Sequence, residues 1–237
     1  MKHITLPDSN SPRRLSFFLA MEEYVARHMK DVDDAFFMWR VEPSVIFGRN
    51  QVMENEVNVD YCRSHNIQLF RRKSGGGCVY ADMGNIMLSY ITNSDSVALT
   101  YNRYLNMVLL VLHKMGLEAH PSGRNDITLN GKKISGNAFY LLQDRSIVHG
   151  TLLYDIDMEN MLASITPSKE KLRKNGVESV RQRITLLREY TSLTIEEVMQ
   201  AFVKTLCHEE RQLTAEEVAA IEEMETEYLT DEFINRQ

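Results

Sequence analysis

The sequence predicts an α+β fold: a central, mostly antiparallel sheet flanked by helices. Two observations lead to this expectation. Segments of strand character follow one another through the middle of the chain across short turns, and Asn130-Gly131 between two alternating runs is a strong hairpin signal. Segments of helical periodicity gather near the two ends and around residue 105. Strands and helices therefore do not alternate as they would in a parallel βαβ sheet.

Up to the first glycine-rich stretch, the chain is expected to form two helices and three strands. The pattern predicts a helix that Ser11 caps and Pro12 opens, strands at 35–41 and 44–48 around a turn at 42–43, a short helix after Asn58, and a strand at 67–72.

The remaining elements follow in the same way. They are two strands around a bend at Met83-Gly84, a long helix from Thr100 to Gly116, the Asn130-Gly131 hairpin, a turn at 143–145, a strand at 146–156, and two helices after Thr194. Residues 167–183 are polar, basic and poorly periodic, which predicts a mobile loop.

Composition limits the class of protein. The chain has 237 residues, a net charge of −6 and 43% hydrophobic residues, which is ordinary for a globular protein. Three cysteines without CxxC spacing favour a reducing cytoplasm, and neither a signal peptide nor a membrane-spanning run is visible. We expect neither nucleic acid nor membrane as a partner.

Charge is distributed unevenly along the chain. From residue 189 to the end there are thirteen acidic and three basic residues, which indicates a solvated helical face. We therefore expect a catalytic domain at 1–190 and an acidic helical extension at 191–237, packed on that domain or following it.

The stretch "RRKSGGGCVYADMGN", residues 71–85, contains the densest local signal. Three glycines after three basic residues would leave backbone N–H groups bare beside positive charge, which suits an anionic ligand. A solvent-exposed turn explains the same stretch, and both interpretations stay open. Dinucleotide and Walker A motifs are excluded, because Tyr80 and Asp126 stand where each motif requires glycine.

A second group of polar residues lies in "SGRNDITLNGKKISG", residues 122–136. Asn125 and Asp126 stand at a strand start, and Lys133 follows the hairpin turn. Lys133 is either a solvated edge residue or a fixed charge that holds a carboxylate against a phosphate. His149, in "VHGT", is expected to be a satisfied strand histidine, and no spacing supports a zinc site.

Four motifs in order, "RRKSGGGCVYADMGN", "SGRNDITLNGKKISG", "VHGTLLYDID" and "ITPSKEKLRKNGVESVRQRITLL", resemble the lipoate–protein ligases of the biotin/lipoate ligase superfamily. The similarity covers about residues 10–190. It implies a catalytic domain like that of biotin/lipoate ligases and class II aminoacyl-tRNA synthetases.

The resemblance implies a reaction in two steps. Lipoate and ATP, with Mg²⁺, give lipoyl-AMP and pyrophosphate, and the acyl group then passes to a lysine of a lipoyl domain. The acceptors would be E2 subunits of 2-oxoacid dehydrogenase complexes or the glycine cleavage H protein. A separate accessory-domain chain is a further expected partner, because relatives without that domain can require one.

The resemblance also implies site residues. Lys133 would be catalytic, Asp126 is a candidate Mg²⁺ ligand, and residues 168–183 would close over the adenylate. Expected substrate and ATP contacts are Arg72, Ser74, Gly75, Gly76, Gly77, Cys78, Val79, Tyr80, Asn85, Asn125, Asp126, Ser135, Gly136, Ala138, His149, Gly150 and Thr151.

One departure from the family is Ala81, which stands where histidine is common and removes a polar contact. Two other functions stay open. A transferase of preformed lipoyl or octanoyl groups would use a cysteine nucleophile, for which Cys78 is the candidate, although a packing role is expected there. A lipoate- or lipoyl-AMP-binding protein without turnover is the other.

Overall fold

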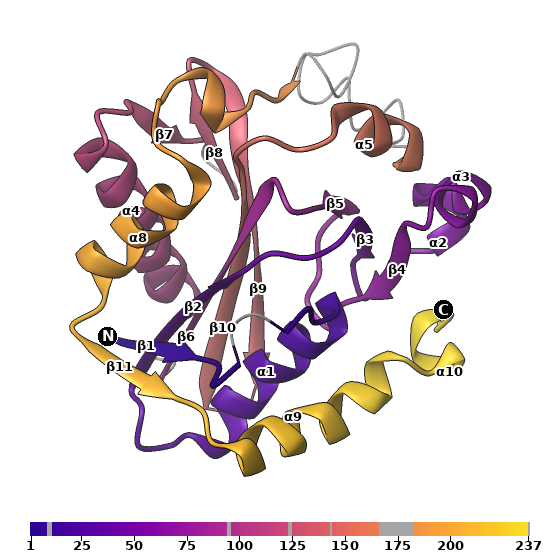
Figure 1. Ribbon diagram of the computed structural model, residues 1–237, viewed down its shortest axis with the longest axis horizontal. Coiled ribbons are helices and arrows are strands. Elements are labelled where there is room, and N and C mark those ends of the chain that lie inside the picture. The colour runs from indigo at the N-terminus through magenta and orange to yellow at the C-terminus, as the bar shows by residue number, and fades with distance from the viewer. Residues whose placement is uncertain (9–10, 94–95, 123–124, 143, 166–182, 237) are drawn as a thin grey trace.

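The computed structural model describes residues 1–8, 11–93, 96–122, 125–142, 144–165 and 183–236. A large twisted sheet runs through the molecule with helices on both faces, and a small sheet lies to one side (Figure 1). In sheet order, the eight strands of the large sheet are β11 (Glu209–Gln212), β1 (Lys2–Thr5), β2 (Asp34–Trp39), β6 (Asn85–Asn93), β10 (Arg145–Leu153), β9 (Lys132–Leu142), β8 (Asp126–Leu129) and β7 (Ala119–Pro121).

The small sheet is separate and has the order β4-β3-β5. Its strands are β4 (Gln68–Arg71), β3 (Ser44–Phe47) and β5 (Val79–Ala81). The helices are α1 (Leu15–His28), α2 (Met53–Glu56), α3 (Val59–Ser64), α4 (Val97–Lys114), α5 (Met158–Ser164), α8 (Ile195–Leu206), α9 (Ala215–Tyr228) and α10 (Asp231–Ile234), with a 3₁₀ turn η1 (Leu187–Glu189).

The predicted α+β class is confirmed. From β2 to β7 every neighbouring pair in the large sheet is antiparallel, and only β1 pairs in parallel, with β2 and with β11. The hairpin expected at Asn130-Gly131 joins β8 to β9, and both residues have positive φ, as a two-residue primed turn requires.

Two predicted helix starts are wrong. The first helix begins at Leu15 after an extended Arg14, and the Ser11 hydroxyl binds the Asp8 carboxylate instead of capping. The long helix begins at Val97, where the Ser96 hydroxyl accepts from the Leu99 amide, so Thr100 lies within it. In both cases a polar residue that precedes an apolar run of helical spacing gives a capping signal that the structure does not use.

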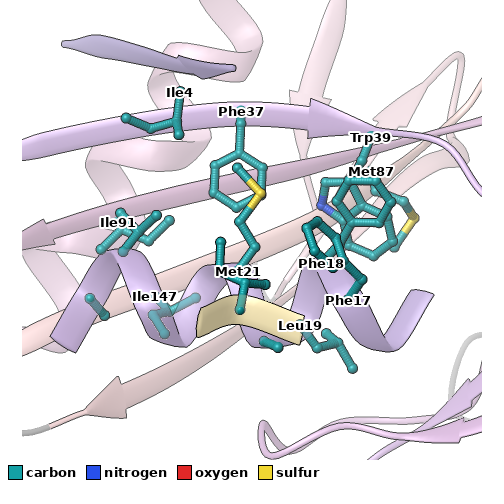
Figure 2. Packing of buried hydrophobic residues seen from close by; sticks show 14 of the residues in the cluster. Ile4, Phe17, Phe18, Leu19, Met21, Phe37, Trp39, Met87, Ile91 and Ile147 are labelled. Atoms are coloured by element: carbon teal, nitrogen blue, oxygen red, sulfur yellow. The ribbon is translucent and has the colours of Figure 1, made fainter. Parts of the chain in front are cut away.

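Two apolar layers enclose the large sheet. On one face α1 packs with α9, and on the other face α4 packs with α8 (Figure 1). Figure 2 shows the first layer, in which Met21 of α1 meets Phe37 of β2, and Phe18 stacks on Trp39 at 4.8 Å between ring centroids. No helix in the described parts of the chain is long and apolar enough to cross a membrane.

The second layer offers a test of the packing. Phe202 of α8 is fully buried, and its ring stacks on Phe36 of β2 at 6.3 Å. Phe202→Ala should lower the free energy of unfolding by about 3–5 kcal/mol, through lost burial and a cavity. Leu99→Ala, on a side chain that is 66% exposed, is the control and should change it by less than about 0.5 kcal/mol. Urea unfolding measures both, and equal effects would contradict the packing described.

Candidate functional site

A cavity of about 580 Å³ opens between the two sheets, bounded by the glycine loop that precedes β5 and by β9 and β10. Its walls combine apolar, amide and charged side chains. They are Leu19, Trp39, Ile46, Arg72, Gly76, Gly77, Cys78, Val79, Met87, Ser122, Asn125, Asp126, Thr128, Gly131, Lys133, Gly136, Asn137, Ala138, His149, Gly150, Thr151 and Arg183. Three sequence motifs far apart in the chain thus meet around one space.

Most of the predicted site residues line this cavity, and five of them do not. Four of the five are buried side chains outside the cavity wall: Ser74, Tyr80, Asn85 and Ser135. The fifth, Gly75, is half-buried. Sequence reasoning missed Leu19, Trp39, Ile46, Met87, Ser122, Thr128, Gly131 and Asn137 as wall residues, whereas Arg183 belongs to the loop expected at 168–183. Apolar wall residues such as Leu19 and Met87 carry no signal that separates them from ordinary core positions.

Arg72 organises the glycine loop. Its side chain is 5% exposed, and it donates to the carbonyl oxygens of Gly75, Gly77 and Ile46 at 2.7–3.2 Å and to Ser74 Oγ at 3.0 Å. Burial lowers the pKa of the guanidinium to about 10, so it remains charged at neutral pH. The charge of Arg72 therefore stabilises the backbone of the glycine loop.

The loop has the orientation that anion binding requires. Each peptide group holds its N–H opposite its C=O, so carbonyls tied back to Arg72 turn the amides of Gly76 and Cys78 away from that cation. Gly76 has φ +98°, and a Cβ there would meet the Arg72 guanidinium at 2.9 Å. Glycine is needed here both for the backbone conformation and for the space.

A chain of buried hydrogen bonds links Trp39 to Ser74 of the glycine loop. Trp39 Nε1 donates to Ser89 Oγ at 2.9 Å, and Ser89 donates to Glu22 Oε1 at 2.6 Å. His149 joins Glu22 Oε2 at 2.9 Å through Nδ1 and Ser74 Oγ at 2.7 Å through Nε2. In the neutral imidazole this order places the proton on Nδ1.

This arrangement has the contacts of a Ser-His-Glu triad, but Ser74 is 2% exposed and does not line the cavity. Its hydroxyl also accepts from Arg72. We therefore interpret the chain of contacts as support for the loop, with Trp39 and His149 as the members that reach the cavity.

A charged group lies across the cavity from the loop. Lys133 Nζ is 2.8 Å from Asp126 Oδ1, and the Arg183 guanidinium binds the other carboxylate oxygen at 2.5 Å. A Cβ at position 136 would meet Lys133 Nζ at 2.5 Å, so Gly136 leaves the space that this ammonium occupies. Beside this charged group, the side-chain amide of Asn125 donates to the backbone carbonyl of Asn137, and the side-chain amide of Asn137 donates to the backbone carbonyl of Asn125.

Asp126 does not fit a resident metal site. Both of its oxygens already bind cationic side chains, and no group of three His, Cys, Asp or Glu side chains in the described residues could hold a metal. Mg²⁺ commonly keeps several waters and binds through substrate phosphates with one or two carboxylates. These residues therefore provide no preformed magnesium site.

The opposite end of the cavity is apolar. Trp39, Leu19 and Met87 gather there at one end of α1 (Figure 2), together with Ile46. The cavity thus has an apolar end and a cationic end, which suits an elongated ligand that carries one anionic group on an aliphatic chain.

Three further expectations have different outcomes. Ala81 is fully buried in the core and does not line the cavity, so its lack of a polar group leaves the wall unchanged. Cys78 lines the cavity and is partly buried. The loop expected at 168–183 lies outside the described residues except for its last member, Arg183.

Comparison with known proteins gives one family. The model of the lipoyl protein ligase A/B catalytic domain matches residues 15–207. Lipoate-protein ligase LplJ of Bacillus subtilis is 36% identical over 76% of this chain and 54% of its own length. Lipoate–protein ligase 1 of Staphylococcus aureus is 36% identical over 87% of the chain and 65% of its own length. The chain thus spans about half to two thirds of these relatives.

Solved structures agree with this result. The bipartite lipoate protein ligase of Thermoplasma acidophilum, studied with its E2 lipoyl domain, matches with a TM-score of 0.83 and 27% identity, over 99% of this chain and 95% of that one. A lipoate-protein ligase A bound with ATP matches with a TM-score of 0.85 and 25% identity, over 100% of this chain and 99% of that one. A T. acidophilum structure with bound lipoic acid has a TM-score of 0.85, 26% identity and full coverage of both chains.

The buried network behind the loop can be tested through stability. Ser74→Ala removes a hydroxyl that bonds both His149 and Arg72, and it should lower the free energy of unfolding by about 1–3 kcal/mol, because buried partners lose a hydrogen bond. Ser64→Ala, an exposed serine on α3, is the matched control and should change it by less than about 0.5 kcal/mol. Urea unfolding of both variants decides, and a Ser74→Ala protein as stable as its parent would contradict the network.

Proposed function

Since the chain belongs to the lipoyl protein ligase A/B catalytic-domain family, we propose that it activates lipoate with ATP and transfers the lipoyl group to a lysine of a lipoyl domain. The first step forms lipoyl-AMP and releases pyrophosphate. Relatives named lipoate–protein ligases, at 36% identity, support this proposal. We also place the chain in the cytoplasm, where its three cysteines would stay reduced.

The observation that carries the proposal is the Lys133 ammonium, which faces the same cavity as the glycine loop and the apolar end. Adenylate formation requires a carboxylate to attack the α-phosphate, and these two anions repel each other. A fixed cation between them, with amide dipoles beside it, lowers that barrier without a covalent enzyme intermediate. Lys133 supplies the cation, and an incoming anion would share it with Asp126.

The apolar end supports the choice of acid. The aliphatic chain and the dithiolane ring of lipoate would lie against Trp39, Leu19 and Met87, with the carboxylate toward Lys133. ATP enters as a substrate, and the structures with bound lipoic acid and with ATP support both ligands. Magnesium would arrive on the phosphates of ATP.

The second step requires a protein acceptor. The lysine of a lipoyl domain would attack the acyl carbon of lipoyl-AMP and release AMP. The T. acidophilum ligase with its E2 lipoyl domain supports an acceptor of the E2 type, and the glycine cleavage H protein is the other candidate. That ligase is bipartite, which supports a separate accessory chain for this protein as well.

A second candidate function is transfer of a preformed lipoyl or octanoyl group without ATP. One observation favours it: Cys78 lines the cavity, where a thiolate could take an acyl group. Pyrophosphate release on mixing protein, lipoate and Mg-ATP separates the ligase from this transferase and from a binding protein without turnover. If adenylation needs an accessory chain, transfer from added lipoyl-AMP would occur while pyrophosphate release would not.

Replacement of the central cation is the direct test. Lys133→Ala should lower the rate of pyrophosphate release by about 10²–10³-fold, because charge stabilisation at the reacting groups is lost. Lys132→Ala, at the exposed neighbouring lysine, is the control and should keep the parent rate. Both variants should give the circular dichroism spectrum of the parent, and an unaltered rate in Lys133→Ala would refute the assigned role.

Replacement of the cysteine separates the two candidate reactions. Cys78→Ala should keep ligation of lipoate to an acceptor domain within about threefold, because the ligase reaction needs no covalent enzyme intermediate. Mass spectrometry of the acceptor measures the transferred group, and that of the enzyme detects any acyl thioester. A thioester on the parent protein, together with loss of transfer in the variant, would favour the transferase.

A further inference from the structure

The three basic residues before the glycine loop do not share one target. Arg71 ends β4, and the chain bends at residues 73 and 74, so the three side chains point to different parts of the molecule. Arg72 turns toward the glycine loop, as described above. Arg71 and Lys73 instead bind the C-terminal helices, which come from more than 150 residues further along the chain.

Lys73 lies in a site built mainly by α1 and α9. Its Nζ is 2.8 Å from Glu23 Oε1 and 2.7 Å from Glu227 Oε2, and its side chain is 16% exposed. The ammonium also lies 4.8 Å from the Tyr228 ring centroid and 5.7 Å from that of Phe233. Burial lowers the pKa of Lys73, but the bonds and charges of Glu227 and Glu23 outweigh it and raise the pKa.

Arg71 makes the second connection. Its Nε donates to the carbonyl of Ile234 in α10 at 2.9 Å, and its other contacts go to the carbonyls of Arg49 and Gln51, also at 2.9 Å, and of Gly48 at 3.2 Å. The side chain is 2% exposed. The last turn of the described chain is therefore fastened to the strand that leads into the loop. In Figure 1, α10 lies beside β4.

Buried contacts hold the helices against the domain. The Tyr228 hydroxyl donates to Glu23 Oε1 at 2.5 Å, the same oxygen that binds Lys73. The Phe233 ring packs edge-on against Tyr228 at 5.1 Å. One carboxylate of α1 thus joins the loop and the C-terminal helices, and a displacement of α9 or α10 would break the contacts that fix residues 71 and 73.

From these contacts we infer that α9 and α10 hold the glycine loop in its binding geometry, with Lys73 and Phe233 as positioning residues for the reaction. The inference rests on the proposed adenylate chemistry for its kinetic consequence only. Neither side chain lines the cavity, so each acts through the loop. The acidic C-terminal segment then contributes to the site by fixing the position of the glycine loop.

The first measurement is hydrogen exchange of the ligand-free protein, which needs no activity. Lys73→Met and Phe233→Ala should speed exchange of residues 72–80 about tenfold, because the loop opens more often without its anchor. Glu222→Gln is the matched control. Glu222 lies on α9, as Glu227 does, but its ion pair is with Arg13 and not with a loop residue. This variant should leave exchange at 72–80 unchanged.

The second measurement is pyrophosphate release. kcat/KM for lipoate should fall about tenfold in Lys73→Met and Phe233→Ala through misplacement of the loop, and Lys73→Arg should restore most of it. If Lys73→Met does not fold, Phe233→Ala decides, since it removes no charge. Unchanged exchange at 72–80 in a folded variant, or equal effects from Glu222→Gln, would overturn the inference. A parent protein that neither releases pyrophosphate nor transfers the lipoyl group from added lipoyl-AMP would refute the proposed function instead, and the exchange result would still stand.

Discussion

The site depends on one constraint: a buried guanidinium must have its donors satisfied. Arg72 meets it with backbone carbonyls of the loop that follows, and glycine at position 76 leaves room for the guanidinium beside them. The same bonds turn the loop amides outward. An interaction needed for stability thus sets the direction of the loop amides, and under the proposed function those amides and Lys133, rather than Arg72, would contact the anion.

The apolar and cationic ends of the cavity are not independent. The chain of hydrogen bonds from Trp39 through Ser89, Glu22 and His149 reaches Ser74, and Ser74 bonds Arg72. Buried polar networks tolerate no missing member, because each unpaired group costs its desolvation free energy. A change at the tryptophan wall is therefore transmitted to the loop. Under the proposed function, this network joins the wall that would accept an acyl chain to the loop that would face a phosphate.

Local chemistry made the main elements predictable, since the Asn130-Gly131 turn, the Thr194 capping box and the long periodic helices each carry their own signal. β11 could not be predicted, because its sequence, EERQ, has no strand preference and becomes a strand by pairing with β1. In the site, the glycine loop and Lys133 stood out by composition. The targets of Arg71 and Lys73 did not, because they depend on which helix lies behind the strand.

The ion group at the cationic end determines the competition that any anionic ligand meets there. Lys133 and Arg183 share the single carboxylate of Asp126, so a ligand carboxylate must compete for a cation that is already paired. A lone fatty acid gains little from that exchange, because it replaces one ion pair by another. Under the proposed function, a nucleotide would bring several phosphate charges at once, and these would compete with the single Asp126 carboxylate for both Lys133 and Arg183. Bound ATP would, under the same proposal, draw Lys133 away from Asp126, and the ammonium would then offset the repulsion between the lipoate carboxylate and the α-phosphate.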